Sequence, residues 1–287
     1  MLTLREALTR ATDQLSASPE LRPSALADAA LLLMHSLAIT RPTLIAHPDR
    51  KLDREQQAAY QRLVERRLTF EPIQYITGNQ EFYGLALRVT PAVLIPRPET
   101  ELLVEAVLAR LDAHAPLRIL DVGTGSGAIA VTLACELPRA AVVALDISEA
   151  ALGVARTNAA YHGVAERLLL GVADLLLTDI AAGPFDLITA NLPYVATAYI
   201  PPFPATLAYE PRVALEGGPD GLEIYRRFLP MAKTRLAPHG CLLMEAGFDS
   251  AEMLGAIAAL VFPRAEVSVV NDYAQQPRLV ILRQGPH

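Results

Sequence analysis

The spacing of hydrophobic residues predicts helices throughout the first part of the chain. Leu4, Leu8, Ala11 and Leu15 recur at helical intervals, which is the pattern of a helix with one buried face. Nothing in this part alternates as a half-buried strand does. We therefore predict a small helical domain over residues 1–78, which either docks a partner or serves as a structural cap.

Two capping patterns mark where further helices begin. Ser24 is expected to cap a helix over residues 25–37. Asp53 followed by Gln56 has the form of a capping box, which predicts a helix that runs towards Leu68. Both helices would pack with the first one in the helical domain.

The hydrophobic period changes after this domain. Apolar residues then favour extended structure with a turn near Gly84, so we predict a β-hairpin linker over residues 79–95. Prolines on both sides of Arg97 keep the backbone extended. This arginine would thus stand on a stiff loop before a helix over residues 102–111.

Apolar strands alternate with helical patterns in the rest of the chain. Such alternation is typical of a mainly parallel sheet with helices on both faces. The last link is too short for a parallel crossover, so the final strand should be antiparallel to its neighbour or inserted beside it. We predict an α/β domain over residues 96–287, with seven strands at 117–122, 141–146, 168–173, 185–190, 241–246, 266–271 and 278–282.

Composition narrows the class of protein further. Hydrophobic residues make up 52% of the chain and the mean hydropathy is +0.28, as in a globular protein rather than a disordered one. No apolar run is long enough to span a membrane, and the N-terminus lacks the apolar core of a secretory signal. We expect a cytoplasmic protein without a metal site, in which Cys135 and Cys241 are buried as reduced thiols.

The charge argues against a nucleic-acid-binding surface. Lysine and arginine number 25 against 31 aspartate and glutamate residues, a net charge of −6, whereas binding to phosphates favours a basic surface. Arg62, Arg66 and Arg67 form a local basic group. We interpret this group as a solvated helix face.

A glycine-rich turn joins the first strand of the α/β domain to a helix. Gly123, Gly125 and Gly127 allow a tight turn and a close approach to a ligand. The turn also satisfies the relaxed dinucleotide pattern, so by itself it does not identify the ligand. Asp121 favours S-adenosylmethionine, because a carboxylate there could lie at the cationic end of this cofactor and would repel a pyrophosphate.

Two further carboxylates end neighbouring strands. Asp146 ends the second strand, where it is well placed for ribose hydroxyls. Asp174 ends the third strand and could bind an adenine amine, or it could be a helix cap or turn former. Ligands bind at the carboxyl edge of open α/β sheets, so both side chains belong to a candidate cofactor site.

The sequence Asn191-Leu192-Pro193-Tyr194 ends the fourth strand. The Asn191 side chain offers one acceptor and two donors. Pro193 stiffens the backbone, and the Tyr194 ring can stack on a planar group. These four residues are expected to hold a flat amide or amine nitrogen against a methyl donor.

A long proline-rich loop follows over residues 195–220. Loops of this length in a compact domain are usually functional or disordered. The aromatic residues Tyr199, Phe203 and Tyr209 favour a functional loop.

These motifs resemble those of the release factor glutamine methyltransferases, a family of class I S-adenosylmethionine-dependent methyltransferases. The resemblance runs from about residue 70 to the C-terminus and is most specific over residues 95–101. The chain departs from the family at Leu192, where a proline is usual, and around residues 245–247. Further matching segments are residues 75–78, 81–84, 209–211, 214–215 and 220–222.

The resemblance implies a Rossmann-like domain with a seven-stranded sheet, preceded by a helical domain that recognises the release factor. It also implies roles for individual residues. Those implied for the cofactor are Gly123, Thr124, Gly125, Ser126, Gly127, Asp146, Leu175 and Asn191. Those expected to bind and orient the substrate are Asn191, Leu192, Pro193, Tyr194, Arg97 and Glu99.

The implied reaction uses S-adenosyl-L-methionine and yields S-adenosyl-L-homocysteine. It methylates the side-chain amide nitrogen (N5) of the glutamine in the Gly-Gly-Gln motif of peptide chain release factors. We expect these proteins to be the partners, with no direct nucleic acid, no membrane and a monomeric enzyme.

Two other functions stay open. Asn-Leu-Pro-Tyr is also the form found in ribosomal RNA adenine methyltransferases, although these would call for a basic face and a helical domain after the catalytic one. A non-catalytic scaffold that binds S-adenosylmethionine and a translation factor is the second alternative.

Overall fold

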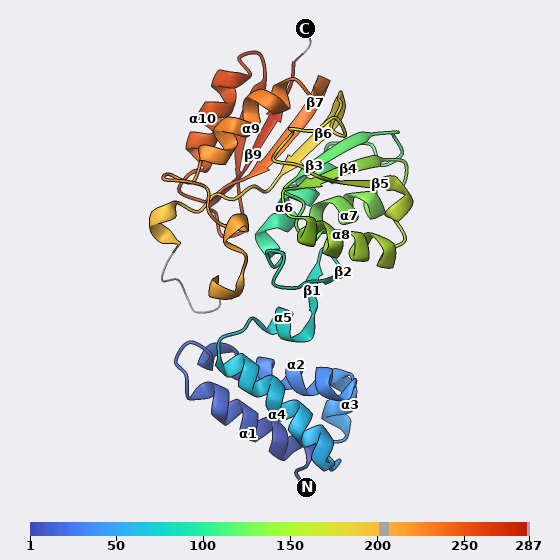
Figure 1. The fold of residues 1–287 in the computed structure, drawn as a ribbon, viewed down its shortest axis with the longest axis vertical. Coiled ribbons are helices and arrows are strands. Elements are labelled where there is room, and N and C mark those ends of the chain that lie inside the picture. The colour runs from blue at the N-terminus through green and yellow to red at the C-terminus, as the bar shows by residue number, and fades with distance from the viewer. Residues whose placement is uncertain (201–206, 286–287) are drawn as a thin grey trace. The chain divides into compact units, whose positions relative to one another are not determined.

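The structure is a computed structural model that describes residues 1–200 and 207–285 (Figure 1). The described chain forms two compact units. The helical unit contains residues 1–79 and 207–209, and the α/β unit contains residues 80–200 and 210–285.

The helical unit contains the predicted amphipathic helices. Its core is made of leucine and alanine side chains, among them Leu4, Leu15, Leu32 and Leu33, which are 0% exposed. The Asp53–Gln56 capping box is confirmed. The helices are α1 (Leu4–Ser16), α2 (Ala25–Leu37), α3 (Arg41–Ala46), α4 (Arg54–Leu68) and α5 (Ile73–Thr77).

Ser24 does not cap α2 as predicted. The helix begins at Ala25, but Ser24 ends a 3-10 turn and its backbone lies in the helical region. The hydroxyl therefore does not reach the first turn of backbone N–H groups. It donates to Asp28 Oδ2 at 2.9 Å.

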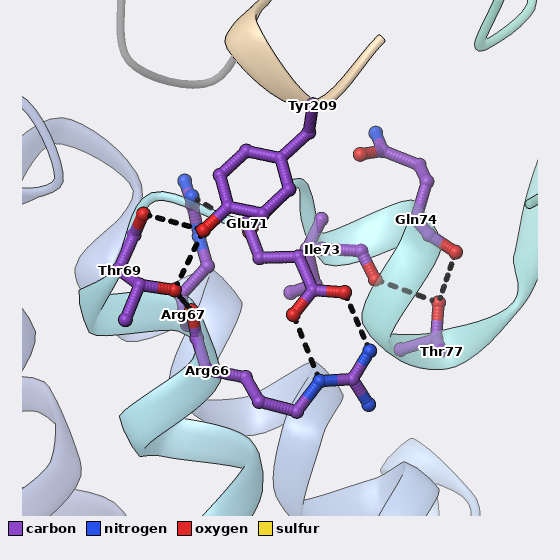
Figure 2. A network of polar contacts seen from close by, with 8 residues as sticks. All are labelled: Arg66, Arg67, Thr69, Glu71, Ile73, Gln74, Thr77 and Tyr209. Atoms are coloured by element: carbon purple, nitrogen blue, oxygen red, sulfur yellow. Dashed lines mark hydrogen bonds and ion pairs between the residues drawn. The ribbon is translucent and has the colours of Figure 1, made fainter. Parts of the chain in front are cut away.

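The basic group on α4 is not one solvated face. Arg62 and Arg66 are exposed, but Arg67 is only 8% exposed. Its Nε donates to Asp28 Oδ2 at 2.8 Å. Arg66 instead forms an exposed ion pair with Glu71 (Figure 2). The sequence interpretation was wrong for Arg67, because a buried partner on α2 compensates its charge.

The 3-10 turn Leu207–Tyr209 belongs to the helical unit. The Tyr209 hydroxyl lies 2.9 Å from the carbonyl oxygen and 2.8 Å from Oγ1 of Thr69, just after α4 (Figure 2). Thus one aromatic residue of the long loop makes a defined contact. Tyr199 is exposed, and Phe203 lies outside the described residues.

The predicted hairpin is present at the start of the α/β unit. Strands β1 (Asn79–Phe82) and β2 (Leu85–Arg88) form a two-stranded sheet. Gly84 turns between them with a φ of +75°, which glycine adopts readily. Phe82 and Leu87 are fully buried and attach the hairpin to the core.

A seven-stranded, mainly parallel sheet forms the centre of the α/β unit, in the order β5-β4-β3-β6-β7-β9-β8. Strand β9 is inserted between β7 and β8 and runs antiparallel to both, as the short link between β8 and β9 requires. The strands are β3 (Arg118–Val122), β4 (Ala141–Asp146), β5 (Leu168–Val172), β6 (Phe185–Ala190), β7 (Leu236–Glu245), β8 (Glu266–Asn271) and β9 (Pro277–Arg283).

Helices cover both faces of this sheet (Figure 1). Helices α6 (Pro98–Leu108), α7 (Ala128–Glu136) and α8 (Glu149–Tyr161) share one apolar core, and α9 (Glu223–Lys233) and α10 (Ala251–Val261) share the other. Helix α6 starts four residues earlier than predicted, since proline is well tolerated at the first helical position.

The strand register aligns the ends of four strands. Val122 of β3 pairs with Leu145 of β4 and with Ala190 of β6, and Ala190 pairs in turn with Met244 of β7. The next residue on each strand therefore lies at the same carboxyl edge. Those four residues are Gly123, Asp146, Asn191 and Glu245.

Both cysteines are free thiols, as expected. Cys241 is buried, but the expectation was wrong for Cys135, which is only half-buried at the end of α7. Within residues 1–200 and 207–285, no helix is both long and apolar enough to cross a membrane. The same ranges contain no cluster of three or more His, Cys, Asp or Glu side chains placed to hold a metal ion.

The two neighbouring arginines of α4 provide a matched test of burial. Arg67→Ala should lower the free energy of unfolding by about 3–5 kcal/mol, because it leaves Asp28 buried without its cation. Arg66→Ala should cost less than about 1 kcal/mol, because its ion pair with Glu71 is exposed. Urea denaturation of the full-length variants, followed by circular dichroism, measures both values. Equal losses of unfolding free energy in the two variants would contradict the assignment of Arg67 to a buried ion pair and Arg66 to an exposed one.

Candidate functional site

A cleft opens at the carboxyl edge of the sheet, within the α/β unit. The glycine turn, the end of β4 and the segments after β5 and β6 line it. Eight of the nine residues predicted to bind a cofactor are on its surface, namely Gly123, Thr124, Gly125, Ser126, Asp146, Asp174, Leu175 and Asn191.

Gly127 is the ninth residue, and it does not line the cleft. A Cβ atom there would lie 3.2 Å from the Ala155 side chain of α8. Its φ of +81° is also unfavourable for other residues. The residue therefore lets the turn approach α8 closely, at the start of α7.

The glycine turn is held by contacts on both sides. Asn158 of α8 donates to the Ser126 carbonyl at 2.8 Å and also bonds both backbone groups of Arg88 on β2. A Cβ on Gly123 would lie 3.1 Å from Leu192 Cδ2. The turn thus packs directly against the residues that follow β6.

Asp146 has the geometry of a ligand for hydroxyl groups. Its Oδ2 accepts the Gly125 N–H at 2.8 Å and its Oδ1 accepts the Ser148 N–H at 2.9 Å. Each carboxylate oxygen has further acceptor capacity, and the side chain lines the cleft. The pair of oxygens and the open backbone of Gly125 suit the diol of a ribose.

Asp174 and Leu175 also line the cleft, at the end of β5. The Asp174 carboxylate forms an ion pair with Arg227 at 2.6 Å. Leu175 is buried with a φ of +56°, an uncommon backbone conformation for leucine. This conformation turns the chain so that Leu175 adds an apolar side chain to the wall of the cleft.

Asp121 does not face the cleft as expected. It is 0% exposed, and its Oδ1 accepts the Thr189 hydroxyl at 2.8 Å. Desolvation raises the pKa of Asp121 to about 6, against the hydrogen bond from Thr189 that lowers it. The sequence suggested a carboxylate at the cationic end of a ligand, but the side chain is buried and bonds Thr189 of the neighbouring strand β6.

The loop after β6 places Asn191, Leu192 and Pro193 on the cleft. Asn191 Nδ2 donates to Thr100 Oγ1 at 3.2 Å and to Glu245 Oε2 at 3.0 Å. With the amino group engaged in this way, Oδ1 is the part of the Asn191 amide that can still accept a hydrogen bond from a ligand. The loop therefore offers an acceptor for an N–H group of a ligand.

Leu192 makes a contact that proline could not make. Its backbone N–H donates to the Tyr225 hydroxyl at 3.1 Å, and Tyr225 is fully buried. The same hydroxyl donates to the carbonyl oxygen of Glu245. Because proline lacks an N–H, this hydrogen bond stiffens the loop in place of a ring.

Tyr194 stands behind the other three residues and does not line the cleft. Its hydroxyl donates to Glu245 Oε1 at 3.1 Å, and burial raises the pKa of the phenol. A Cβ atom on Gly217 would lie 2.7 Å from the Pro193 carbonyl oxygen, and one on Gly221 would lie within 2.2 Å of the Tyr194 carbonyl oxygen. These glycines let the returning loop brace the backbone of the tetrapeptide.

Arg97 and Glu99 are the two charged residues predicted to bind the substrate. Only Arg97 lines the cleft. It forms an ion pair with Glu210, which is 7% exposed and also accepts the Ile95 N–H at 3.2 Å. Glu99 is exposed on the first turn of α6, and Thr100 faces the cleft in its place. The contacts of Glu210 fix the loop that carries Arg97.

Sequence reasoning gave no role to several residues that shape this site, including Thr100, Asn158, Glu210, Tyr225 and Glu245. Each acts through a contact between segments far apart in the chain. The arrangement as a whole can hold a ribose at Asp146 and a flat N–H donor at Asn191, side by side in one cleft.

Comparison with known proteins agrees with this geometry. Residues 6–78 match a family model described as the PrmC N-terminal domain, and residues 113–252 match a model described as a methyltransferase domain. The chain is 44% identical to a release factor glutamine methyltransferase of Moorella thermoacetica over 96% of this chain and 97% of that protein. It is 41% identical to the protein of the same name from Koribacter versatilis over 99% of both.

Solved structures add a similarity of fold. The ribosomal protein L11 methylase from Lactobacillus delbrueckii subsp. bulgaricus aligns with a TM-score of 0.51 and 23% identity, over 71% of this chain and 90% of that one. At this identity the match concerns the fold of the α/β unit alone.

Asp121→Asn tests the burial of the carboxylate. Because the folded pKa of about 6 lies above the unfolded value, the native state keeps a proton that the unfolded chain has lost, and Asp121 lowers stability as pH rises through this window. As the pH rises from about 4 to about 7, the free energy of unfolding of the variant should therefore increase by on the order of 2 kcal/mol relative to that of the wild type. Urea unfolding at several pH values measures this difference. A difference that is constant or shrinks with pH would show that the carboxyl is not desolvated.

Proposed function

The chain belongs to the release factor glutamine methyltransferase family, and from this premise we propose that Asn191, Leu192, Pro193 and Tyr194 hold the substrate glutamine. The protein is an S-adenosylmethionine-dependent enzyme that methylates a glutamine of release factors. We assign the reaction to the side-chain amide nitrogen (N5) of the glutamine in the Gly-Gly-Gln motif. The tetrapeptide at the end of β6 supports a flat N–H group as the methyl acceptor, and membership of the family supports a glutamine of a release factor.

S-adenosylmethionine supplies a methyl group on a sulfonium centre, which needs no metal ion to be transferred. The glycine turn and Asp146 would hold its nucleoside, with the carboxylate accepting hydrogen bonds from the ribose hydroxyls. Leu175 would form an apolar wall for the adenine, and Asp174 would accept from its amine. The chemical character of these residues thus agrees with the cofactor.

The task of the protein is to orient a weak nucleophile. The nitrogen of an amide is poorly nucleophilic because its lone pair is delocalised into the carbonyl group. Asn191 Oδ1 and the carbonyl oxygen of Leu192 would each accept one N–H of the glutamine amide. Two fixed acceptors hold the nitrogen with its lone pair towards the methyl group and stabilise the positive charge that develops on it.

The remaining residues support this geometry. Stacking of Tyr194 on the glutamine amide, which the sequence suggested, does not fit its place outside the cleft. We propose that Tyr194 supports the loop from behind, with its hydroxyl bound to Glu245. Arg97 would contact the peptide that carries the glutamine, and we propose the same for Glu99 from its place beside Arg97. No strong general base is needed, since a methylated amide nitrogen that still carries its extra proton is very acidic and loses that proton readily.

The roles of the domains, the location of the enzyme and its oligomeric state are also part of our proposal. We assign residues 1–78 to recognition of the release factor, residues 79–95 to a hairpin linker and residues 96–287 to catalysis. We propose that the enzyme acts as a cytoplasmic monomer without direct contact to nucleic acid. The net charge of −6 supports this last point.

Ribosomal RNA is the substrate to test against, because Leu192 gives the tetrapeptide the form that suits an adenine amine. The acidic charge and the leading helical domain support a protein substrate. Methyl transfer from tritiated S-adenosylmethionine should label purified release factor and leave ribosomal RNA unlabelled. Label on RNA alone would refute the proposed substrate.

Asn191→Ala should lower kcat on release factor by at least about 100-fold, because it removes one of the two acceptors aimed at the amide. The fold should persist, since the side chain is only half-buried. The tritium assay and circular dichroism measure the two effects. Near-normal turnover in a folded variant would exclude the acceptor role of Asn191.

Asp146→Ala should weaken the binding of S-adenosylhomocysteine by about 10- to 100-fold, since hydrogen bonds to a charged group are worth about 1.5–3 kcal/mol. Glu149→Gln is the control, because it changes an exposed carboxylate on α8 near the same strand end. Isothermal titration calorimetry compares the variants. Equal affinity in wild type and Asp146→Ala would remove Asp146 from the cofactor site.

A further inference from the structure

Glu245 is a buried carboxylate that neither binding assignment above uses. It is the last residue of β7 and is 2% exposed. A carboxylate at such a position is costly unless hydrogen bonds compensate its lost hydration. Its partners therefore indicate why the chain has it there.

Two of those partners belong to the tetrapeptide. Oε2 accepts Nδ2 of Asn191 at 3.0 Å, and Oε1 accepts the hydroxyl of Tyr194 at 3.1 Å. One side chain thus holds the first and the last residue of the loop. The carbonyl oxygen of Glu245 accepts the hydroxyl of Tyr225, which in turn binds the N–H of Leu192.

The contact with Asn191 determines which way its amide faces. An asparagine side chain can rotate to exchange its oxygen and its amino group, and either could point at the substrate. An ionised carboxylate only accepts hydrogen bonds, so it selects the orientation in which Nδ2 faces Glu245 and Oδ1 faces the cleft. In the opposite orientation, the amino group would meet the N–H groups of the glutamine amide.

The other groups near the carboxylate agree with this role. Burial raises the pKa of Glu245, while hydrogen bonds from Thr100 and Tyr194 and the charge of Arg278 favour the ionised form. Thr100 also accepts from Asn191 Nδ2 at 3.2 Å. Asn191 therefore has two acceptors on one side, both of which direct Oδ1 away from them.

We propose that Glu245 is a positioning residue for the methyl transfer, which fixes the amide orientation of Asn191 and the ring position of Tyr194. This inference rests on the proposed function, because it concerns the same substrate loop. It adds that the acceptor of the substrate N–H is selected by a carboxylate on the neighbouring strand. Glu245 itself does not touch the substrate.

Glu245→Gln tests the role, because glutamine has nearly the same shape and presents an amino group to one of the two donors. We expect kcat on release factor to fall by about 10- to 100-fold, while KM and the affinity for S-adenosylhomocysteine stay within threefold of wild type. Tritium transfer and calorimetry on the full-length protein provide these values. An unchanged kcat, or a loss of cofactor affinity in step with kcat, would overturn the positioning role.

Asp272→Asn is the matched control. Asp272 is a carboxylate with 6% exposure in the turn before β9, and its bonds go to Arg278 and to backbone N–H groups of its own turn. The variant makes the same chemical change without a direct contact to the tetrapeptide. It should retain kcat within threefold, and a loss equal to that of Glu245→Gln would attribute both effects to general destabilisation and overturn the proposal.

A second variant decides the matter if Glu245→Gln does not fold. Tyr194→Phe keeps the ring and removes the hydroxyl that Glu245 Oε1 accepts, so it breaks one of the two contacts by which Glu245 holds the loop. It should lower kcat by at least fivefold with cofactor affinity unchanged, and full kcat would overturn the proposal. Wild-type enzyme that fails to label release factor would instead refute the proposed function, so the two failures are distinct.

Discussion

The parallel register of four neighbouring strands is the constraint on which the rest of the structure depends. Val122, Leu145, Ala190 and Met244 lie at one level of the sheet. The residues after them are a glycine for a turn, a carboxylate for hydroxyl groups, an asparagine for an amide and a second carboxylate that orients the asparagine. A shift of one strand by one residue would move its functional side chain to the other face of the sheet.

Much of this edge was predictable from sequence because it is built from local patterns. The presence of all seven strands, the inserted antiparallel β9 and the glycine turn followed from hydrophobic period, link length and glycine spacing. The exception in extent is β7, which starts at Leu236 and not at residue 241 as predicted. The failures at Arg67 and Asp121 occurred where a distant partner decides the outcome. Arg67 was expected in solvent but pairs with Asp28, and Asp121 was expected at a ligand but bonds Thr189. No local pattern reveals such partners, since both pairs join separate elements.

The departure at Leu192 illustrates the same limit. Judged from sequence, the missing proline ring makes the loop less rigid, and the resulting Asn-Leu-Pro-Tyr form favours an adenine substrate. In the structure, the N–H that leucine adds is bound by the buried hydroxyl of Tyr225. The loop is held by a hydrogen bond and by the close approach of Gly217 and Gly221. Rigidity is thus a property of the packed site and not of the tetrapeptide alone.

The central claim is that this loop presents a glutamine amide of a release factor to the methyl donor. Tandem mass spectrometry of release factor after incubation with the enzyme and S-adenosylmethionine tests it most directly. We expect one added methyl group on the side chain of the glutamine in the Gly-Gly-Gln motif. A methyl group on any other residue, or on ribosomal RNA in its place, would contradict it.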